Sequence, residues 1–371
     1  MRKIPVSRPE LTPLCKEYAI DAIENDAISG IFGDYIEKFE NSFANFTGVN
    51  HCISCSNGTT AIHLALLAVG VKPGDEVLVS ATTNMATFFA VEYLGAVPIA
   101  VDIDPLTYTM DPADLENKVS HKSVAILCVH LFGQLCDMIA IKKIADNNNL
   151  KIIEDCAEAH GASYRDSKAG SFGDVSAFSF FSNKLLTCGE GGTVVTNDAH
   201  IAEKVRELKS LSFGRTSKFL HEDLGYNYRL SNIACAIGFS QTLQADALIN
   251  RRIEVCENYI NEFSEVSEFI SVPTKRKAYF NTHWMAHFKL RSNAQMERGD
   301  FLYELLKNGI ETREGFIPYT LQTYRGKTVD LTSCPVANSL AYNTFYLPTF
   351  NSISDDDQNY VIDTVKSILL K

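Results

Sequence analysis

A lysine and an aspartate in this 371-residue chain have the residue types and surroundings that amino-group chemistry requires. Lys184 closes an aromatic-rich run that starts at Phe178, and a glycine-rich turn over 189–192 follows it, while Asp155 ends an apolar run. A buried lysine amine attacks carbonyl groups, and a buried carboxylate pairs with a protonated ring nitrogen. The two residues therefore predict a site for pyridoxal 5′-phosphate (PLP), which Lys184 would bind as a Schiff base and whose pyridinium nitrogen Asp155 would keep protonated.

Both residues also have ordinary structural explanations. Most lysines are solvated at the surface, and an aspartate after a strand often caps a helix. The aromatic run before Lys184 and the pair Leu185-Leu186 after it favour a buried amine, whose pKa burial would lower.

A phosphate site is predicted at the start of a helical stretch, in the segment Ser56–Ala61. Small and hydroxyl residues such as Gly58 and Thr59 at a helix N-terminus leave backbone N–H groups and the positive end of the helix dipole for an anion. A plain helix cap without a ligand is the alternative. Ser179, five residues before Lys184, is expected to add a hydroxyl to the same phosphate.

The elements that must position these residues follow an alternating pattern between residues 50 and 200. Short apolar runs alternate with stretches that have apolar residues at helical spacing, which predicts an α/β domain with a mostly parallel sheet flanked by helices. Asp155 and the segment before Thr59 would lie at carboxyl ends of strands, where such sheets bind ligands. The predicted strands cover 77–79, 98–101, 125–129, 151–153 and 193–195, and the predicted helices cover 60–68, 85–94 and 138–147.

The pattern changes after about Ser231. A long helix is predicted over Ala234–Phe263, followed by a β-like run over 283–290 and helices over 296–308 and 355–370. We therefore expect a large PLP-binding α/β domain over 1–245, including the N-terminal segment, and a smaller α+β domain over 246–371.

Composition excludes several classes of function. The net charge of −11 argues against nucleic-acid binding, which needs a basic face. The longest apolar stretch is too short to span a bilayer, and the first residues lack the apolar region of a signal peptide. Ten cysteines without a repeating framework indicate reduced thiols. We expect a cytoplasmic protein with no membrane or nucleic-acid partner.

Two spacings that suggest metal or redox sites are better explained by structure. Cys52 and Cys55 have the spacing of half a zinc or redox motif, but no second pair accompanies them. His283 and His287 have zinc-site spacing only on a helix, and they fall in a β-like run. No metal site is predicted. The glycine-rich phosphate motifs of dinucleotide-binding and P-loop proteins are also absent from the sequence.

Taken in order, five segments resemble those of the DegT-type sugar aminotransferases, a fold-type I PLP family. The segments are Glu154–Gly161, Gly170–Asp174, Ser179–Lys184, Gly189–Gly192 and Gly225–Arg229. The resemblance covers nearly the whole chain. It implies transfer of an amino group from L-glutamate to a keto sugar for lipopolysaccharide or O-antigen biosynthesis. The acceptor implied is GDP-4-keto-6-deoxymannose, and the product GDP-perosamine.

The resemblance also implies residue roles. Lys184 would bind the cofactor and carry the proton, and Asp155 would pair with the ring nitrogen. Glu158 would lie near the ring 3-hydroxyl. Gly58, Thr59 and Ser179 would hold the phosphate. Asn227 would reach the cofactor of a neighbouring subunit, which makes the expected active unit a homodimer with shared sites, and Arg229 would contact the donor's carboxylate or begin a helix with an ion pair.

The chain departs from the family pattern on the expected substrate side. Asn84 takes the position where relatives have an aromatic residue that stacks on PLP. Tyr319 follows Pro318 where a histidine is usual, and the early glycine-rich segment that contains Phe32 also differs.

These departures leave alternatives open. One is the free sugar acid 8-keto-Kdo as acceptor, giving 8-amino-3,8-dideoxy-octulosonate. Its carboxylate would need a cation, which the loop with Arg215, Lys218 and His221 could supply, although a solvated loop is the favoured explanation of those residues. The other alternative is a PLP-binding regulator that no longer turns over.

Overall fold

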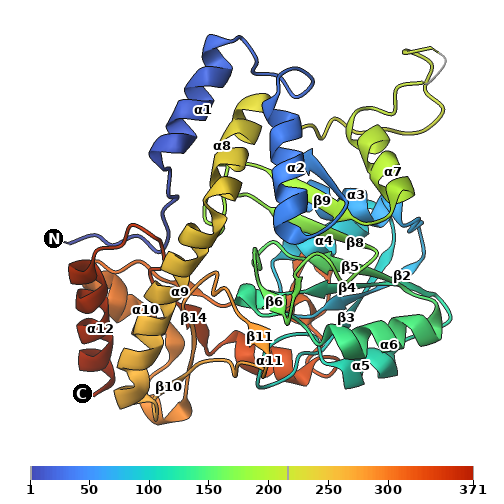
Figure 1. The fold of residues 1–371 in the computed structure, drawn as a ribbon. Helices are drawn as coiled ribbons and strands as arrows, with labels where there is room; N and C mark the ends of the chain where they lie inside the picture. Colours follow the sequence, from blue (N-terminus) through green and yellow to red (C-terminus); the bar gives the residue numbers. More distant parts are fainter. Residues whose placement is uncertain (1, 215–216, 371) are drawn as a thin grey trace.

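A seven-stranded sheet forms the centre of the protein in the computed structural model, which describes residues 2–214 and 217–370 (Figure 1). The order across the sheet is β1-β9-β8-β5-β4-β2-β3. The strands are β1 (His51–Cys55), β9 (Gly192–Thr196), β8 (Val175–Ser179), β5 (Lys151–Asp155), β4 (Ser123–Val129), β2 (Glu76–Ser80) and β3 (Val97–Val101).

Six of these strands point the same way, which confirms the predicted mostly parallel sheet. Strands β8, β5, β4, β2 and β3 pair in parallel, and β9 is antiparallel to both of its neighbours, so β1 runs with the parallel set. The carboxyl ends of β1, β2, β4, β5 and β8 therefore meet at one edge of the sheet.

Helices cover both faces because the strands are apolar on both sides. Val77 and Val79 of β2 pack in a core with α3, α4 and α7, whereas Leu78 between them packs in another core with α5 and α6. Helices α2 and α8 cover the β1-β9-β8 end. The bounds are α2 (Tyr35–Thr47), α3 (Gly58–Ala68), α4 (Met85–Tyr93), α5 (Pro112–Lys118), α6 (Met138–Asn148), α7 (Ala199–Lys209) and α8 (Asn232–Leu243).

The C-terminal part forms a second, smaller core on the side where both chain ends lie (Figure 1). A sheet of order β10-β12-β14-β13 packs there with α9, α10 and α12. Its elements are α9 (Ala245–Glu262), β10 (Ile270–Ser271), β12 (His287–Leu290), α10 (Arg298–Lys307), β13 (Arg313–Glu314), β14 (Thr344–Tyr346) and α12 (Asp355–Leu369). Helix α11 (Pro335–Ala341) instead packs on the core of the large sheet, and α1 (Pro13–Glu24) packs on α8. A small sheet joins β11 (Tyr279–Phe280), β6 (Ser163–Tyr164) and β7 (Ser167–Lys168).

Two sequence-based predictions of elements are wrong in detail. The single helix predicted over Ala234–Phe263 is broken at Gln244 (φ −111°), whose N–H bonds back to Gln241 and whose side chain donates to Thr12. The β-like run begins as a strand only at His287, because His283 has φ +50° and its N–H bonds to the Asn281 side chain. The division at residue 245 stays a prediction. Among the described residues, no helix has both the length and the apolar character required to cross a membrane.

Candidate active site

A cavity of about 590 Å³ lies where the carboxyl ends of the parallel strands meet. Its lining comes from segments that directly follow β1, β2, β5 and β8, and from three aromatic residues of the C-terminal part. The lining includes Gly58, Thr59, Asn84, Thr87, Asp155, Glu158, Ser179, Asn183, Lys184, Glu190, Trp284, Phe316 and Tyr346. Residues from distant parts of the sequence thus converge because parallel strands end together.

Lys184 lies at the centre of this lining. Its Nζ is 3.9 Å from Oε1 of Glu158 and 4.1 Å from the ring centroid of Trp284. Burial lowers the pKa of the Lys184 amine, and the carboxylates of Glu158 and Asp155 partly oppose this shift. A desolvated amine of lowered pKa is the form of lysine that attacks carbonyls and exchanges protons.

Asp155 ends β5 as a buried carboxylate held at both oxygens. Oδ2 accepts a hydrogen bond from the Thr87 hydroxyl at 2.8 Å, and Oδ1 accepts one from the Ala157 N–H at 3.1 Å. Burial raises the pKa of Asp155, while these two bonds and the Lys184 amine oppose the rise. The fixed orientation suits a carboxylate that pairs with a cationic ring N–H.

Glu154, the residue before Asp155, fixes the end of β5 through hydrogen bonds to neighbouring segments. The sequence did not reveal this role. The Glu154 carboxylate is fully buried, and burial favours its neutral form, but its hydrogen bonds lower its pKa overall. His130 accepts the Cys136 N–H at Nδ1, so its Nε2 carries the hydrogen that Glu154 accepts. The other donors to Glu154 are the N–H groups of Gly170, Phe172 and Gly173 and the hydroxyl of Ser176.

Glu158, one turn beyond Asp155, accepts a hydrogen bond from the Phe132 N–H at 2.9 Å. Burial raises the pKa of the Glu158 carboxyl to about 7, although the Lys184 amine acts in the opposite direction. Near neutral pH this group exists in both protonation states, and it can donate or accept a hydrogen bond at the cavity wall.

Replacing Glu158 with glutamine is expected to change how stability depends on pH. A carboxyl whose folded pKa of about 7 exceeds its ordinary value of 4.5 binds more protons folded than unfolded, so its contribution falls as pH rises between these values. Within this window the parent should lose about 1 kcal/mol of unfolding free energy per pH unit relative to the variant. Denaturant unfolding of the cofactor-free chain at several pH values measures this, and parallel curves for the two proteins would contradict it.

The start of α3 has the features of a phosphate cradle. Asn57 and Thr60 form a reciprocal capping box, while the N–H groups of Gly58 and Thr59, at the first two helical positions, have no acceptor within the helix. A Cβ at Gly58 would lie 2.8 Å from the Cβ of Ser179, so only glycine lets the two segments approach this closely. These donors, with Asp155 and Lys184 across the cavity, fit a group that has a phosphate, a ring nitrogen and an aldehyde, as PLP does.

Asn84 lines the cavity, and its side chain caps α4 by accepting the Ala86 N–H at 3.0 Å, while its predicted stacking on the cofactor stays a prediction. The described residues that line the cavity do not include Phe32, Asn227, Arg229 or Tyr319. Tyr319 instead stacks on Phe88, with ring centroids 4.0 Å apart.

The other three predicted residues lie elsewhere. The side chain of Phe32 is 63% exposed, Asn227 forms a β-bridge with Ser210, and Arg229 donates to the Ser210 hydroxyl. Their functional roles stay predictions.

The loop proposed for a substrate carboxylate does not contribute to this cavity within the described residues. Arg215 lies outside them, Lys218 lies over the rings of Phe213 and Phe219, and His221 contacts the Leu211 carbonyl.

Two buried groups of side chains have metal-ligating types: Cys128, His130 and Cys136, and His130, Glu154 and Cys156. Neither contains the pairs Cys52/Cys55 or His283/His287. Since His130 and Glu154 already bond each other, we assign these groups to anchoring β5.

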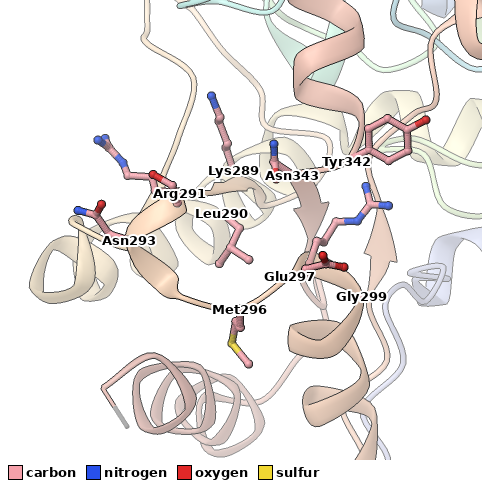
Figure 2. Close-up of a pocket in the computed structure, with 11 residues that line it drawn as sticks. Lys289, Leu290, Arg291, Asn293, Met296, Glu297, Gly299, Tyr342 and Asn343 are labelled. Atoms are coloured by element: carbon pink, nitrogen blue, oxygen red, sulfur yellow. The ribbon is translucent and has the colours of Figure 1, made fainter.

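A larger hollow of about 890 Å³ lies between β12 and α10, around the loop shown in Figure 2. Its charged lining includes the half-buried Lys289, the exposed Arg291, and Arg298, which pairs with Glu314 at 2.7 Å. This hollow does not lie at the carboxyl ends of the parallel strands, and its described lining contains no buried carboxylate. The cavity that contains Lys184 is therefore the candidate active site.

Comparisons with known proteins agree with this choice. Residues 11–366 match the DegT/DnrJ/EryC1/StrS aminotransferase family. The chain is 40% identical over 366 residues to GDP-perosamine synthase from Escherichia coli O157:H7 (98% of each chain) and 36% identical over 369 residues to GDP-perosamine synthase from Caulobacter vibrioides (99% of each). The solved structure of S. venezuelae DesV in complex with a ketimine intermediate superimposes with a TM-score of 0.89 at 29% identity, covering 98% of this chain and 99% of DesV.

Proposed function

This chain belongs to the DegT/DnrJ/EryC1/StrS aminotransferase family of PLP-dependent sugar aminotransferases, and we propose that it converts GDP-4-keto-6-deoxymannose to GDP-perosamine with L-glutamate as donor. The supporting observation is that three relatives named GDP-perosamine synthase are 34–40% identical over at least 98% of the chain. The product would serve surface polysaccharide biosynthesis, such as the O-antigen of a lipopolysaccharide. The ten buried, unpaired cysteines favour a reducing compartment, and we propose the cytoplasm.

The cavity residues can perform each step of amino-group transfer. When bound, PLP supplies an electron sink for the electron pair left on the substrate carbon. Asp155 would keep the ring nitrogen protonated, and the α3 N-terminus with Ser179 would hold the phosphate. The Lys184 amine would take the proton from the donor carbon and give it to C4′ of the cofactor. With the keto sugar it would take a proton from C4′ and give it to the sugar carbon, so one residue acts as base and acid in each half of the reaction. Glutamate leaves as 2-oxoglutarate before the keto sugar enters.

Charge balance supports a homodimer with shared sites. Among the residues that the structure describes, the charged ones that line the cavity are Lys184, Asp155, Glu158 and Glu190, so carboxylates outnumber cations there. The proposed ligands add a phosphate and the carboxylates of glutamate. We therefore propose that a second copy of the chain supplies further donors, Asn227 among them, with Arg229 near the donor's carboxylate.

A two-step spectroscopic experiment tests the donor and the acceptor separately. L-glutamate should convert the enzyme to its pyridoxamine form, with loss of the visible band of the lysine-bound cofactor. After removal of the donor, GDP-4-keto-6-deoxymannose should restore that band. Enzyme whose Lys184 is replaced by methionine, loaded with PLP, is the control and should show no conversion.

The runner-up acceptor is the sugar acid 8-keto-Kdo. Asn84 motivates it, because an amide in place of an aromatic ring makes the substrate side more polar. Restoration of the band by 8-keto-Kdo and not by the GDP-sugar would overturn the proposed acceptor. Failure of glutamate to convert the enzyme would overturn the proposed donor.

A further inference from the structure

We infer that Trp284 is a positioning residue whose indole face receives the Lys184 amine whenever that amine is not bonded to the cofactor. The inference rests on the proposed amino-group transfer, in which the lysine must leave the cofactor, act as a free base and return. Because the lysine side chain is flexible, its amine needs a defined position while it is detached from the cofactor.

The geometry holds the indole at two points. The Lys184 Nζ lies 4.1 Å from the ring centroid, and the indole Nε1–H donates a 2.8 Å hydrogen bond to the carbonyl of Asn183, the residue before the lysine. The ring is therefore oriented by the same loop whose lysine it faces. Trp284 is only 2% exposed, so its contact with the lysine amine is desolvated.

Two other aromatic side chains pack near the indole ring. Phe132 stacks near it with centroids 5.7 Å apart, and Phe316 lies parallel to it at 6.3 Å. The N–H of Phe132 also donates a hydrogen bond to Glu158, whose Oε1 lies 3.9 Å from the lysine amine. The amine thus lies close to both an aromatic face and a carboxylate.

This arrangement affects the proton that the lysine carries. The charged groups near the amine are Glu158 and Asp155, which favour its protonated form, whereas burial favours the neutral form. His160 is also nearby, but burial lowers its pKa to about 3, so it stays neutral. An aromatic face stabilises a desolvated ammonium, so Trp284, like the carboxylates, raises the pKa of the Lys184 amine against the effect of burial. The amine can then both accept and donate a proton.

Trp284 is the only tryptophan in the chain, so its fluorescence reports on this contact directly. With enzyme loaded with pyridoxamine 5′-phosphate, in which the lysine is free, Trp284 emission should change in one step across neutral to alkaline pH as the amine loses its proton. The same protein with Lys184→Met, loaded in the same way, should show no step. A step of equal size and midpoint in both proteins, or no step in the parent, would overturn the inference.

Two substitutions of Trp284 separate positioning from structural support. Trp284→Phe keeps an aromatic face but loses the N–H donor to Asn183, and Trp284→Leu loses both. Because the amine must be neutral to accept a proton, its pKa sets the acid limb of the rate profile for glutamate-driven conversion. In the leucine variant that limb should move down by roughly one pH unit, and in the phenylalanine variant by less.

Purely structural damage would lower the rate at every pH and leave the limb in place, which would contradict the inference. The fluorescence step needs neither glutamate nor a sugar, so a wrong donor or acceptor would not affect it. Failure of the proposed function and failure of this inference are therefore distinguishable.

Discussion

Enzyme with Lys184 replaced by alanine is expected to lose about four orders of magnitude in kcat for amino-group transfer. In the proposed function the amine is the nucleophile that binds the cofactor and the group that moves the proton, and the described part of the cavity lining contains no other lysine. Single-turnover conversion by L-glutamate, followed by absorbance, measures the loss. The melting temperature of the unliganded variant should be unchanged or higher, because a buried cationic group has been removed.

The matched control is Lys142→Ala. Lys142 is 61% exposed on α6 and pairs only loosely with Asp146, so its replacement should leave kcat and stability unchanged. If Lys184→Ala retained turnover within about tenfold of the parent, the assignment of Lys184 as the proton carrier would be wrong.

Asp155→Asn is expected to lower kcat by about three orders of magnitude while the protein stays folded. The amide keeps the shape of the side chain but removes the negative charge that keeps the ring nitrogen protonated. The cofactor's absorbance should then change with pH in the variant over a range where it is constant in the parent. Steady-state kinetics together with a pH titration of that absorbance check both parts.

Thr87→Val serves as a graded companion to this substitution. It removes the 2.8 Å hydrogen bond to Asp155 without touching the charge, so the pKa of the carboxyl should rise and kcat should fall by about tenfold. If Thr87→Val were as impaired as Asp155→Asn, or if Asp155→Asn were as active as the parent, the proposal that Asp155 pairs with the ring nitrogen of the cofactor would be wrong.

Local pattern alone predicted much of this site. The strands around 77–79, 98–101, 125–129, 151–153 and 193–195 were predicted correctly, because strands buried on both faces are short apolar runs bounded by polar residues. The ends of such runs then placed Asp155 and the start of α3 at one edge of the sheet. The family that the segments between residues 154 and 229 indicated is confirmed by the family match over residues 11–366.

Residues that act through distant partners could not be found this way. Thr87 bonds a carboxylate 68 positions away, and Trp284 faces a lysine 100 positions (284 − 184) before it. Glu154 received no role of its own from the sequence, although it accepts five hydrogen bonds from three other segments. The break between α8 and α9 likewise depends on a bond from Gln244 to Thr12.

The sequence by itself determined the family of the chain and the elements on which the candidate residues lie, because residue type and hydrophobic period are local properties of the chain. Only the tertiary structure decided how they are held: Asp155 between Thr87 and Ala157, and Lys184 between Glu158 and Trp284. The physical reason is that burial and hydrogen-bond direction, which set the pKa and orientation of each group, come from segments brought together only by folding.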